Sequence, residues 1–383
     1  FLTARLGKRR AWLLLSQVCI AAALLGMANT DPAQNLTHMV YLALAVAFAS
    51  ATQDIALDAY RIEAVEIEKQ GAMAATYQAG YRIAMITAGA GVLWIAAAFD
   101  PSEATYDFRP WQVAYTVMAA LMAVGILTTL TIREPEKKTS LTTTEREAHT
   151  RERFAAAGLS GWLLTATAWF HSAVLAPFID FIQRYKWQAV LMLALIAVYR
   201  ISDVVMGVMS NPFYQEMGFT KDEVATVSKV YGVVMTIAGA GLGGLLVMRM
   251  GVMRTLFLGA VLSAATNLLF VWLAGRGHDV GALVFTISAD NLSAGIASSA
   301  FVAYLSSLVN QAYSATQYAL FTSVMLLMPK FIAGFSGEFV DAFGWANFFT
   351  GTALIGVPVL LLVWLVGRQA DRLVRREHED KPV

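Results

Sequence analysis

Long apolar stretches separated by short polar segments make up most of the chain. Ten of these stretches are long enough to cross a bilayer, because a membrane helix needs about 20 consecutive apolar residues. We predict membrane-spanning helices at residues 11–29, 39–61, 72–98, 111–132, 188–211, 223–248, 252–274, 280–309, 314–340 and 345–367. The pattern therefore indicates an all-α integral membrane protein with short connections.

The connection at residues 133–187 is the exception to these short loops. It opens with a polar, charge-mixed run, which we expect to be solvated, and then carries an apolar segment at residues 159–182 with basic residues at both ends. If this segment lies along the membrane surface, the cytoplasmic segments collect 21 Lys and Arg residues and the outer loops only three. Because basic residues gather on the cytoplasmic side, we favour an interfacial helix there over a further crossing.

These features divide the chain into four parts. We predict an N-terminal transmembrane half at residues 1–132, a cytoplasmic linker with the interfacial helix at 133–187, a C-terminal transmembrane half at 188–367 and a cytoplasmic tail at 368–383. Four spans before the linker and six after it form an uneven division, which an internal repeat can explain.

Three pairs of segments repeat between the two halves at nearly constant offset. They are residues 5–10 (RLGKRR) with 249–254 (RMGVMR), 56–65 with 300–309, and 75–79 (ATYQA) with 315–319 (ATQYA). Two six-helix halves in parallel repeat are the architecture of the major facilitator superfamily. We therefore expect the first two helices of the first half to lie outside this sequence.

Composition agrees with a membrane protein and excludes several other classes. The chain is 57% hydrophobic and 14% charged, and its formal net charge of +1 gives no basic field for nucleic acid. Its one cysteine, Cys19, lies in an apolar stretch, and its five histidines show no metal-ligand spacing. We therefore expect no disulfide framework, metal or cofactor.

Ionisable side chains lie deep inside the predicted spans. They are Asp54, Asp58, Arg82, Arg200, Asp203, Lys229, Asp290 and Lys330. One charge at the bilayer centre costs about 2.5–3.5 kcal/mol, so these groups must face one another, a water-filled path or a polar substrate. This favours a transporter. A membrane enzyme would need a carboxylate or histidine cluster in an outer loop, which the short outer loops do not offer, and a receptor would not need so many intramembrane charges.

Two carboxylates stand one helical turn apart in the segment SATQDIALDAY at residues 50–60. Asp54 and Asp58 share one helix face, and two carboxylates in a low dielectric cannot both be ionised without a large energetic cost. We therefore predict a proton-exchanging pair. The alternative is that Asp58, which lies nearer the cytoplasmic end, pairs with Arg61.

Cations in both halves could recognise an anionic substrate. Arg200 and Asp203 stand at i, i+3, which fits either an intrahelical ion pair or a fixed guanidinium for a substrate carboxylate. Arg82 follows Tyr81 and has no obvious partner in its own helix. Lys229 and Lys330 could each pair with Asp290, and the sequence leaves that choice open.

Several motifs together resemble the AmpG muropeptide permease family of the major facilitator superfamily. They are LGKRRAWLL (6–14), SATQDIALDAYR (50–61), GYRIAM (80–85), YRISDVVMG (199–207), FTKDEVATVSKVYG (219–232), DNLSAG (290–295) and ATQYALFTS (315–323). The resemblance implies proton-driven import of N-acetylglucosaminyl-anhydro-N-acetylmuramyl peptides across the bacterial inner membrane for cell-wall recycling, linked to β-lactamase induction. It implies a transporter that we expect to act as a monomer. A more distant similarity to acetyl-coenzyme A transporters keeps another anionic metabolite as the alternative.

Such a substrate has carboxylates, sugar hydroxyls, amides and often a free amine. The cations that match the carboxylates are Arg82, Arg200, Lys229 and Lys330. The side chains that match the hydroxyls and amides are Gln53, Asn291, Gln317, Tyr77, Tyr81 and Tyr318. Asp203 and Asp290 complete the predicted site.

Overall fold

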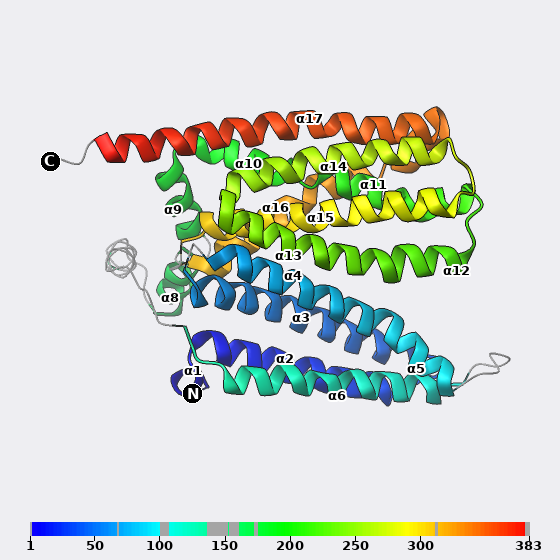
Figure 1. The fold of residues 1–383 in the computed structure, drawn as a ribbon. Helices are drawn as coiled ribbons and strands as arrows, with labels where there is room; N and C mark the ends of the chain where they lie inside the picture. Colours follow the sequence, from blue (N-terminus) through cyan, green and yellow to red (C-terminus); the bar gives the residue numbers. More distant parts are fainter. Residues whose placement is uncertain are drawn as a thin grey trace. The chain divides into compact units, whose positions relative to one another are not determined.

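The structure is a computed structural model that describes residues 2–66, 69–99, 107–135, 152, 161–171, 175–310 and 313–379. These residues are almost entirely helical, and no strand occurs among them (Figure 1). The all-α fold predicted from the apolar pattern is confirmed.

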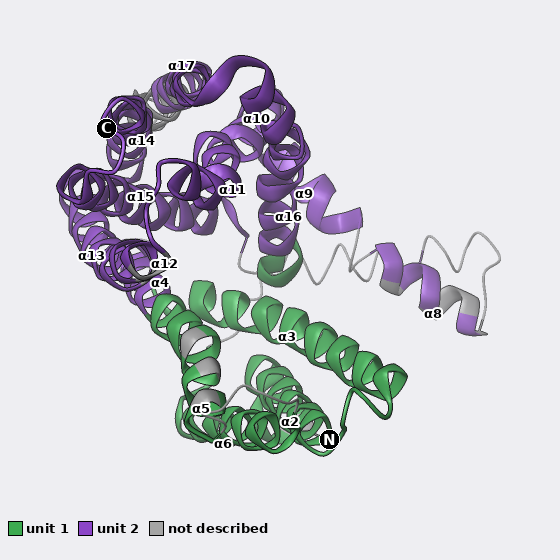
Figure 2. Ribbon diagram, turned by 90° about the vertical axis from the view of Figure 1, so that its right-hand side faces the viewer, with its two compact units in different colours: residues 1–65, 80–146, 311–316 green, residues 66–79, 147–310, 317–383 purple. Residues whose placement is uncertain are grey.

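The chain divides into two compact units, coloured separately in Figure 2. Unit 1 comprises residues 1–65, 80–146 and 311–316, and unit 2 comprises residues 66–79, 147–310 and 317–383. The division differs from the halves predicted at residues 1–132 and 188–367, because a short stretch of each half clusters with the other unit.

Unit 1 is built on a short helical bundle. Its helices are α1 (Leu2–Leu6), α2 (Lys8–Ala28), α3 (Leu36–Ala64), the second part of α4 (Gln70–Ile86), the π-helix η2 (Thr87–Gly91), α5 (Val92–Phe99) and α6 (Arg109–Thr131). Helix α2 packs against α3 and α6, and α5 packs against α6. The side chain of Asn35 caps α3 by accepting a hydrogen bond from the backbone N–H of His38 at 3.0 Å.

Unit 2 contains the larger bundle. Its helices are α8 (Gly161–Phe170), α9 (Ala176–Tyr185), α10 (Gln188–Val198), α11 (Ile201–Glu216), α12 (Lys221–Val224), η4 (Ala225–Tyr231), α13 (Gly232–Met250), α14 (Val252–Ala274), α15 (Val280–Leu308), most of α16 (Ser314–Ala333) and α17 (Ser336–Glu379). Helix α15 packs against both α13 and α14, and α17 packs against α14, α11 and α10.

Glycines allow α13 and α15 to approach closely. A Cβ added to Gly239 would lie 2.1 Å from the carbonyl oxygen of Leu292, and one added to Gly295 would lie 2.3 Å from that of Thr236. No side chain fits in such gaps, so the glycine run at residues 239–244 serves helix packing, as small residues commonly do between membrane helices.

Nine helical stretches among the described residues are long and apolar enough to cross a membrane. They are Lys8–Ala28, Leu36–Ala64, Gln70–Ala96, Arg109–Thr131, Gln188–Glu216, Thr226–Met250, Val252–Ala274, Val280–Leu308 and Ser336–Arg368. Each corresponds to one of the ten predicted spans.

The predicted span at residues 314–340 has no counterpart among these nine. Helix α16 covers most of it but ends at Ala333, and α17 begins after a turn at residues 334–335. The polar residues Gln317 and Lys330 and the proline between α16's last two turns lower its apolar content. The sequence pattern therefore predicted the helix correctly and its extent wrongly.

The predicted interfacial segment at residues 159–182 forms two short helices in the described part of the linker. Helices α8 and α9 have 10 residues each, and α9 continues to Tyr185. Neither is among the nine candidate spans.

The repeat between the halves is visible in backbone geometry. Gly7 precedes α2 with φ 90° and ψ 170°, and Gly251 precedes α14 with φ 84° and ψ 165°. These glycines are the matched positions of the first repeat pair, and both occupy a region of φ that side-chain-bearing residues rarely adopt. Equivalent turns thus connect equivalent helices.

Candidate functional site

Arg200 and Asp203 form the centre of a polar cluster inside unit 2. Arg200 lies at the break between α10 and α11, and its Nε is 3.1 Å from Oδ2 of Asp203. Its Nη1 donates to Oγ of Ser298 on α15 at 2.9 Å. The predicted intrahelical ion pair therefore forms, and α15 holds the same guanidinium from a second side. Both side chains keep some exposure, 23% for Arg200 and 18% for Asp203.

Helix α14 supplies hydroxyl donors to two carboxylates of this cluster. Ser263 donates to Oδ1 of Asp203, and Thr266 donates to Oδ1 of Asp290 at 3.2 Å. Asp203 and Asp290 also interact electrostatically. Within the part of the chain that the structure describes, Asp290 has no ion-pair partner. Of the two pairings that the sequence left open, the one with Lys330 is therefore not observed, and the side chain of Lys229 lies outside the described residues.

Two asparagines lie on the helices that contribute to this cluster: Asn267 on α14 and Asn291 on α15. The Asn291 side chain accepts from Oγ1 of Thr236 at 2.8 Å and donates to the carbonyl oxygen of Ile287 at 3.0 Å. Asn267, only 1% exposed, makes no hydrogen bond with either end of its amide among the described residues. Buried amides are normally paired, so Asn267 leaves unused hydrogen-bonding capacity in the core of unit 2.

Gln317, a predicted substrate ligand, is fully buried in a second cluster between α9 and α16. Its amide nitrogen donates to Oδ2 of Asp180 at 3.0 Å and to the carbonyl oxygen of Pro177 at 2.9 Å. Its amide oxygen accepts from Arg184 at 3.1 Å and from the backbone N–H of Asn310 at 2.7 Å. Both ends of the amide are therefore occupied by protein groups.

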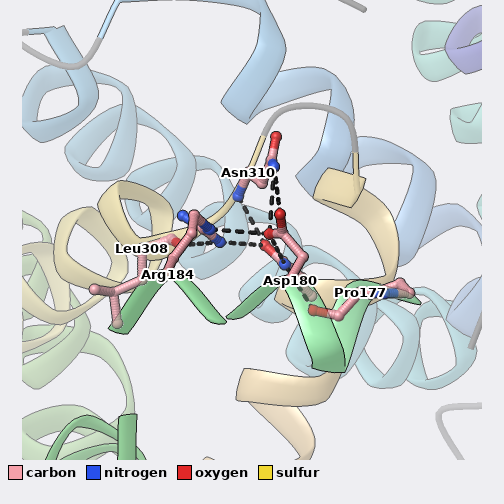
Figure 3. Close-up of polar contacts among 6 residues, drawn as sticks. Pro177, Asp180, Arg184, Leu308 and Asn310 are labelled. Atoms are coloured by element: carbon pink, nitrogen blue, oxygen red, sulfur yellow. Dashed lines mark hydrogen bonds and ion pairs between the residues drawn. The ribbon is translucent and has the colours of Figure 1, made fainter. Parts of the chain in front are cut away.

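Figure 3 shows how Asp180 and Arg184 organise this cluster. Nε of Arg184 lies 2.9 Å from Oδ2 of Asp180, and its Nη2 donates to the carbonyl oxygen of Leu308 at 3.2 Å. The side-chain amide of Asn310 donates to both Asp180 oxygens, at 3.2 and 3.3 Å. Asp180 was not among the site residues predicted from the sequence. Its partner Arg184 lies one turn away on the same helix, but Asn310 and Gln317 are more than a hundred residues distant in sequence.

The other predicted residues of unit 2 are spread along its helices. Tyr318 is buried on α16, whereas Lys330 near the other end of the same helix is exposed. Lys229 lies in η4, and its side chain falls outside what the structure describes. Neither lysine is therefore placed in the Arg200 cluster.

In unit 1 the paired carboxylates of α3 differ in their surroundings. Oδ1 of Asp58 lies 3.5 Å from Nη2 of Arg61, a side chain that is only 3% exposed. Asp54 is exposed and has no ion-pair partner among the residues that the structure describes. Next to it, the amide oxygen of Gln53 is buried and accepts no hydrogen bond from those residues. The alternative pairing of Asp58 with Arg61 is thus observed, and it leaves Asp54 as the uncompensated carboxylate.

The aromatic and basic residues predicted on α4 face different surroundings. Tyr77 and Arg82 are half-buried, and the side chain of Tyr81 is 57% exposed. Tyr77 belongs to the stretch of α4 in unit 2, and the other two belong to unit 1.

A cluster at the start of α2 was missed by the sequence reasoning, although the motif LGKRR marks its position. The carboxylate of Glu134 accepts from the backbone N–H groups of Arg9 and Arg10 at 2.7 and 3.0 Å. The guanidinium of Arg9 lies 2.6 Å from Glu63 and donates to Ser314 at 2.8 Å. The sequence signal that could have found this cluster is the repeat, because glycine and arginine recur at the same spacing in residues 5–10 and 249–254.

No group of three or more His, Cys, Asp or Glu side chains that could hold a metal ion occurs within the described ranges. The chemistry of the two units is therefore that of buried ion pairs, amides and hydroxyls.

Comparisons with known proteins agree with this architecture. The model of the Major Facilitator Superfamily matches the chain over residues 1–213 and again over residues 191–383. The putative transporter AmpG 4 of Rickettsia conorii is 31% identical over 367 residues, which cover 96% of this chain and 81% of the relative. The anhydromuropeptide permease of Escherichia coli K12 is 33% identical over 374 residues, 96% of this chain and 68% of the permease.

Solved structures show the same fold at low sequence identity. The proton:xylose symporter XylE superposes with a TM-score of 0.65 at 14% identity, covering 94% of this chain and 80% of the symporter. The transporter FucP in its outward conformation gives a TM-score of 0.65 at 11% identity, covering 94% and 83% of the two chains.

A multi-pass helical chain that matches this model along its whole length is a member of the major facilitator superfamily, and so a transporter of small molecules rather than an enzyme. Within the superfamily the chain belongs to the AmpG family, since relatives of that name share about a third of its residues over nearly its full length. The resemblance carried by the sequence motifs is confirmed.

Proposed function

We propose that the protein is a proton-coupled importer of anhydromuropeptides in the bacterial inner membrane, where it acts as a monomer and serves cell-wall recycling. The observation that supports this most is the 33% identity to the anhydromuropeptide permease of Escherichia coli over 96% of the chain. The same import would link the protein to β-lactamase induction. Import of another anionic metabolite, such as acetyl-coenzyme A, is the alternative.

The chemistry of unit 2 supports an anionic sugar-peptide as substrate. Asp203 and Ser298 contact Nε and Nη1 of Arg200, so Nη2 is the nitrogen that remains to bind a substrate carboxylate. Arg82 is the corresponding candidate in unit 1. Asp290, with one hydroxyl donor, suits a substrate amine.

The surroundings of the α3 carboxylates support Asp54 as the proton carrier. Asp58 lies 3.5 Å from Arg61, whereas Asp54 has no such cation among the described residues. An uncompensated carboxylate within a membrane span is the group that gains most by taking up a proton.

The direct test is uptake of radiolabelled anhydromuropeptide by proteoliposomes that contain the protein, with an inward proton gradient. We expect accumulation above the equilibrium level, abolished by a protonophore and unaffected by excess acetyl-coenzyme A. Uptake of acetyl-coenzyme A without uptake of muropeptide would establish the alternative. Uptake of muropeptide that only equilibrates, with or without the gradient, would retain the substrate and remove the proton coupling.

The sidedness of the linker and tail is a further part of this proposal. The 21-to-three distribution of basic residues supports a cytoplasmic position for both. In a variant with Cys19 replaced by Ser, single cysteines at Thr142, Gln183 and Arg276 would be treated in intact cells with an impermeant maleimide. We expect labelling at Arg276, an outer-loop position, and none at the other two. Labelling of Gln183 but not Thr142 would show that the linker crosses the membrane.

A further inference from the structure

Helix α9 turns its charged side chains toward the rest of unit 2 and its exposed apolar side chains the opposite way. Asp180, Phe181 and Arg184 lie on the face that meets the rest of unit 2. The other face carries large apolar side chains at positions i, i+3, i+4 and i+7. These are Leu175, just before the helix, at 42% exposure, Phe178 at 38%, Ile179 at 42% and Ile182 at 55%.

This arrangement is the reverse of a helix that packs on a protein and faces water. Such a helix turns its apolar stripe inward and its charged residues outward. In α9 the carboxylate of Asp180 is buried and bonded inside unit 2, while the apolar stripe points away from it. Exposed apolar surface of this kind is suited to an apolar medium rather than to water.

The helix cannot rotate to cover this stripe. Asp180 accepts from Arg184, Asn310 and Gln317, and the donors of the last two come from the connection between α15 and α16 and from α16 itself. Turning α9 would break the bonds from Asn310 and Gln317 to the buried carboxylate of Asp180, and losing a hydrogen bond between buried groups is costly.

The position of α9 along the unit is also fixed. Only Lys186 and Trp187 separate its last residue from α10, the start of the candidate membrane span Gln188–Glu216. Lys186 adopts φ 50°, which turns the chain sharply, and α9 runs across the direction of α10 in Figure 1. The stripe therefore lies level with the end of a membrane span.

The connection itself carries residues suited to a membrane surface. Trp187 is 76% exposed, and Lys186 is exposed and forms no ion pair with any residue in the described ranges. Burial raises the pKa of the neighbouring Tyr185, so this phenol stays neutral. Tryptophan and lysine beside an apolar stripe are typical of helices at the level of lipid headgroups.

We propose that α9 is a lipid-binding helix. Its stripe of Leu175, Phe178, Ile179 and Ile182 inserts at the boundary of the acyl chains, and Lys186 binds the headgroup of an anionic phospholipid. The Asp180 cluster sets the rotation of the helix, so unit 2 carries a rigid lipid contact beside its first span. This inference depends on the membrane spans and not on the identity of the substrate.

Site-directed spin labelling tests the insertion. In the full chain with Cys19→Ser, a nitroxide would be attached to single cysteines at Ile179, at Lys69, which is 70% exposed, and at Ala189, which is 3% exposed. In nanodiscs we expect the label at Ile179 to collide with oxygen and not with a water-soluble nickel chelate, and the label at Lys69 to do the opposite. Collision with nickel as at Lys69, or with neither reagent as at Ala189, would overturn the proposal, because water or protein would then cover the stripe.

A local lipid assay tests the headgroup contact. Bimane at Ile179→Cys would be quenched by brominated phosphatidylglycerol or by brominated phosphatidylcholine in mixed nanodiscs. We expect stronger quenching by the anionic lipid, and a preference about fivefold lower in Lys186→Gln, since one Lys near an anionic surface contributes about 1 kcal/mol. The matched charge loss Lys69→Gln should leave the preference unchanged. An equal loss in both variants, or no preference at the start, would remove Lys186 as a lipid ligand.

Discussion

At the scale of the residue, Arg200 shows how one side chain can hold two protein partners and still have a nitrogen free to bind a substrate. Two of its nitrogens are engaged by Asp203 and Ser298, and its helix break places it between α10 and α11. A lysine would keep the charge but could not span two partners and a ligand at the same time, because it presents a single ammonium group.

We therefore predict that Arg200→Lys raises the KM for anhydromuropeptide uptake about tenfold, which corresponds to about 1.4 kcal/mol, with less effect on the maximal rate. Ser298→Ala, which removes one positioning contact and no charge, should have a smaller effect. Uptake measured in proteoliposomes over a range of substrate concentrations separates the two parameters. Unchanged kinetics in Arg200→Lys would assign the residue to the ion pair alone.

The matched glycines before α2 and α14 have the same backbone but different neighbours. Both have positive φ, yet a Cβ on Gly7 would lie 2.3 Å from the Glu134 side chain, whereas a Cβ on Gly251 would meet nothing within 4 Å. Glu134 accepts from the first N–H groups of α2, so it cannot move without leaving them unpaired.

Gly251→Ala should therefore destabilise by backbone strain alone, about 1–3 kcal/mol, because φ 84° with ψ 165° is a conformation that essentially only glycine adopts. Gly7→Ala should cost more, because the strain adds to a displaced Glu134. Gly80→Ala, at a position with open space, is the control. Apparent Tm in detergent should be highest in Gly80→Ala, lower in Gly251→Ala and lowest in Gly7→Ala. Equal values for Gly251→Ala and Gly7→Ala would contradict the role of Glu134.

The sequence predicted contacts between residues one helical turn apart, but not contacts between residues distant in sequence. Helical spacing gave the contact between Asp58 and Arg61 and that between Arg200 and Asp203, because both partners of each pair lie within one turn. Gln317 bonds to Asp180 across 137 positions, and no periodicity encodes such a contact. The sequence could propose Gln317 as a polar group in a span, but not that α9 occupies both ends of its amide.

At the scale of the element, α9 depends on one buried carboxylate. Asp180 is the common acceptor for Arg184, Asn310 and Gln317, so its removal takes one acceptor away from each of three donors. Arg184 keeps its bond to Leu308 and is about a third exposed, which limits the penalty on that side.

We predict that Asp180→Ala lowers the free energy of unfolding by about 2–3 kcal/mol. Asp180→Asn, which keeps an acceptor oxygen, should cost less, and Asp341→Ala, at an exposed acidic residue of α17, should have almost no effect. Apparent Tm and the mobility of a spin label at Ile179 would report the loss of the cluster. A rigid label and an unchanged Tm in Asp180→Ala would show that other contacts hold α9.

Apolar runs predicted most elements because length decides whether a helix can cross a bilayer. They failed where a helix is long but polar: α16 carries Gln317 and Lys330, and its end at Ala333 cannot be read from hydropathy. In the linker, the interfacial position of residues 159–182 stays a prediction, and only the buried contacts of Asp180 distinguish the two faces of α9.

At the scale of the whole molecule, the proposed proton coupling requires that a proton and a substrate bias the same conformational equilibrium. Binding of each need only differ between the outward-open and inward-open states for their flows to be coupled. The carboxylates of α3 divide the roles: Arg61 compensates Asp58, and Asp54 is left without a cation among the described residues. On the proposed mechanism, we therefore expect Asp54 to be the group whose charge changes during the cycle.

Asp54→Asn imitates the protonated carboxyl at nearly constant volume. We predict that it still binds anhydromuropeptide and exchanges labelled for unlabelled substrate across the membrane, since neither process moves a net proton. It should fail to accumulate substrate against its gradient when only a pH difference drives uptake, because the residue can no longer release a proton. Counterflow and pH-driven uptake in the same proteoliposomes measure the two activities. Asp58→Asn, which removes the carboxylate charge beside Arg61, should weaken both. If Asp54→Asn accumulates substrate normally while Asp58→Asn or Asp290→Asn exchanges without accumulating, the proton is carried by that other carboxylate.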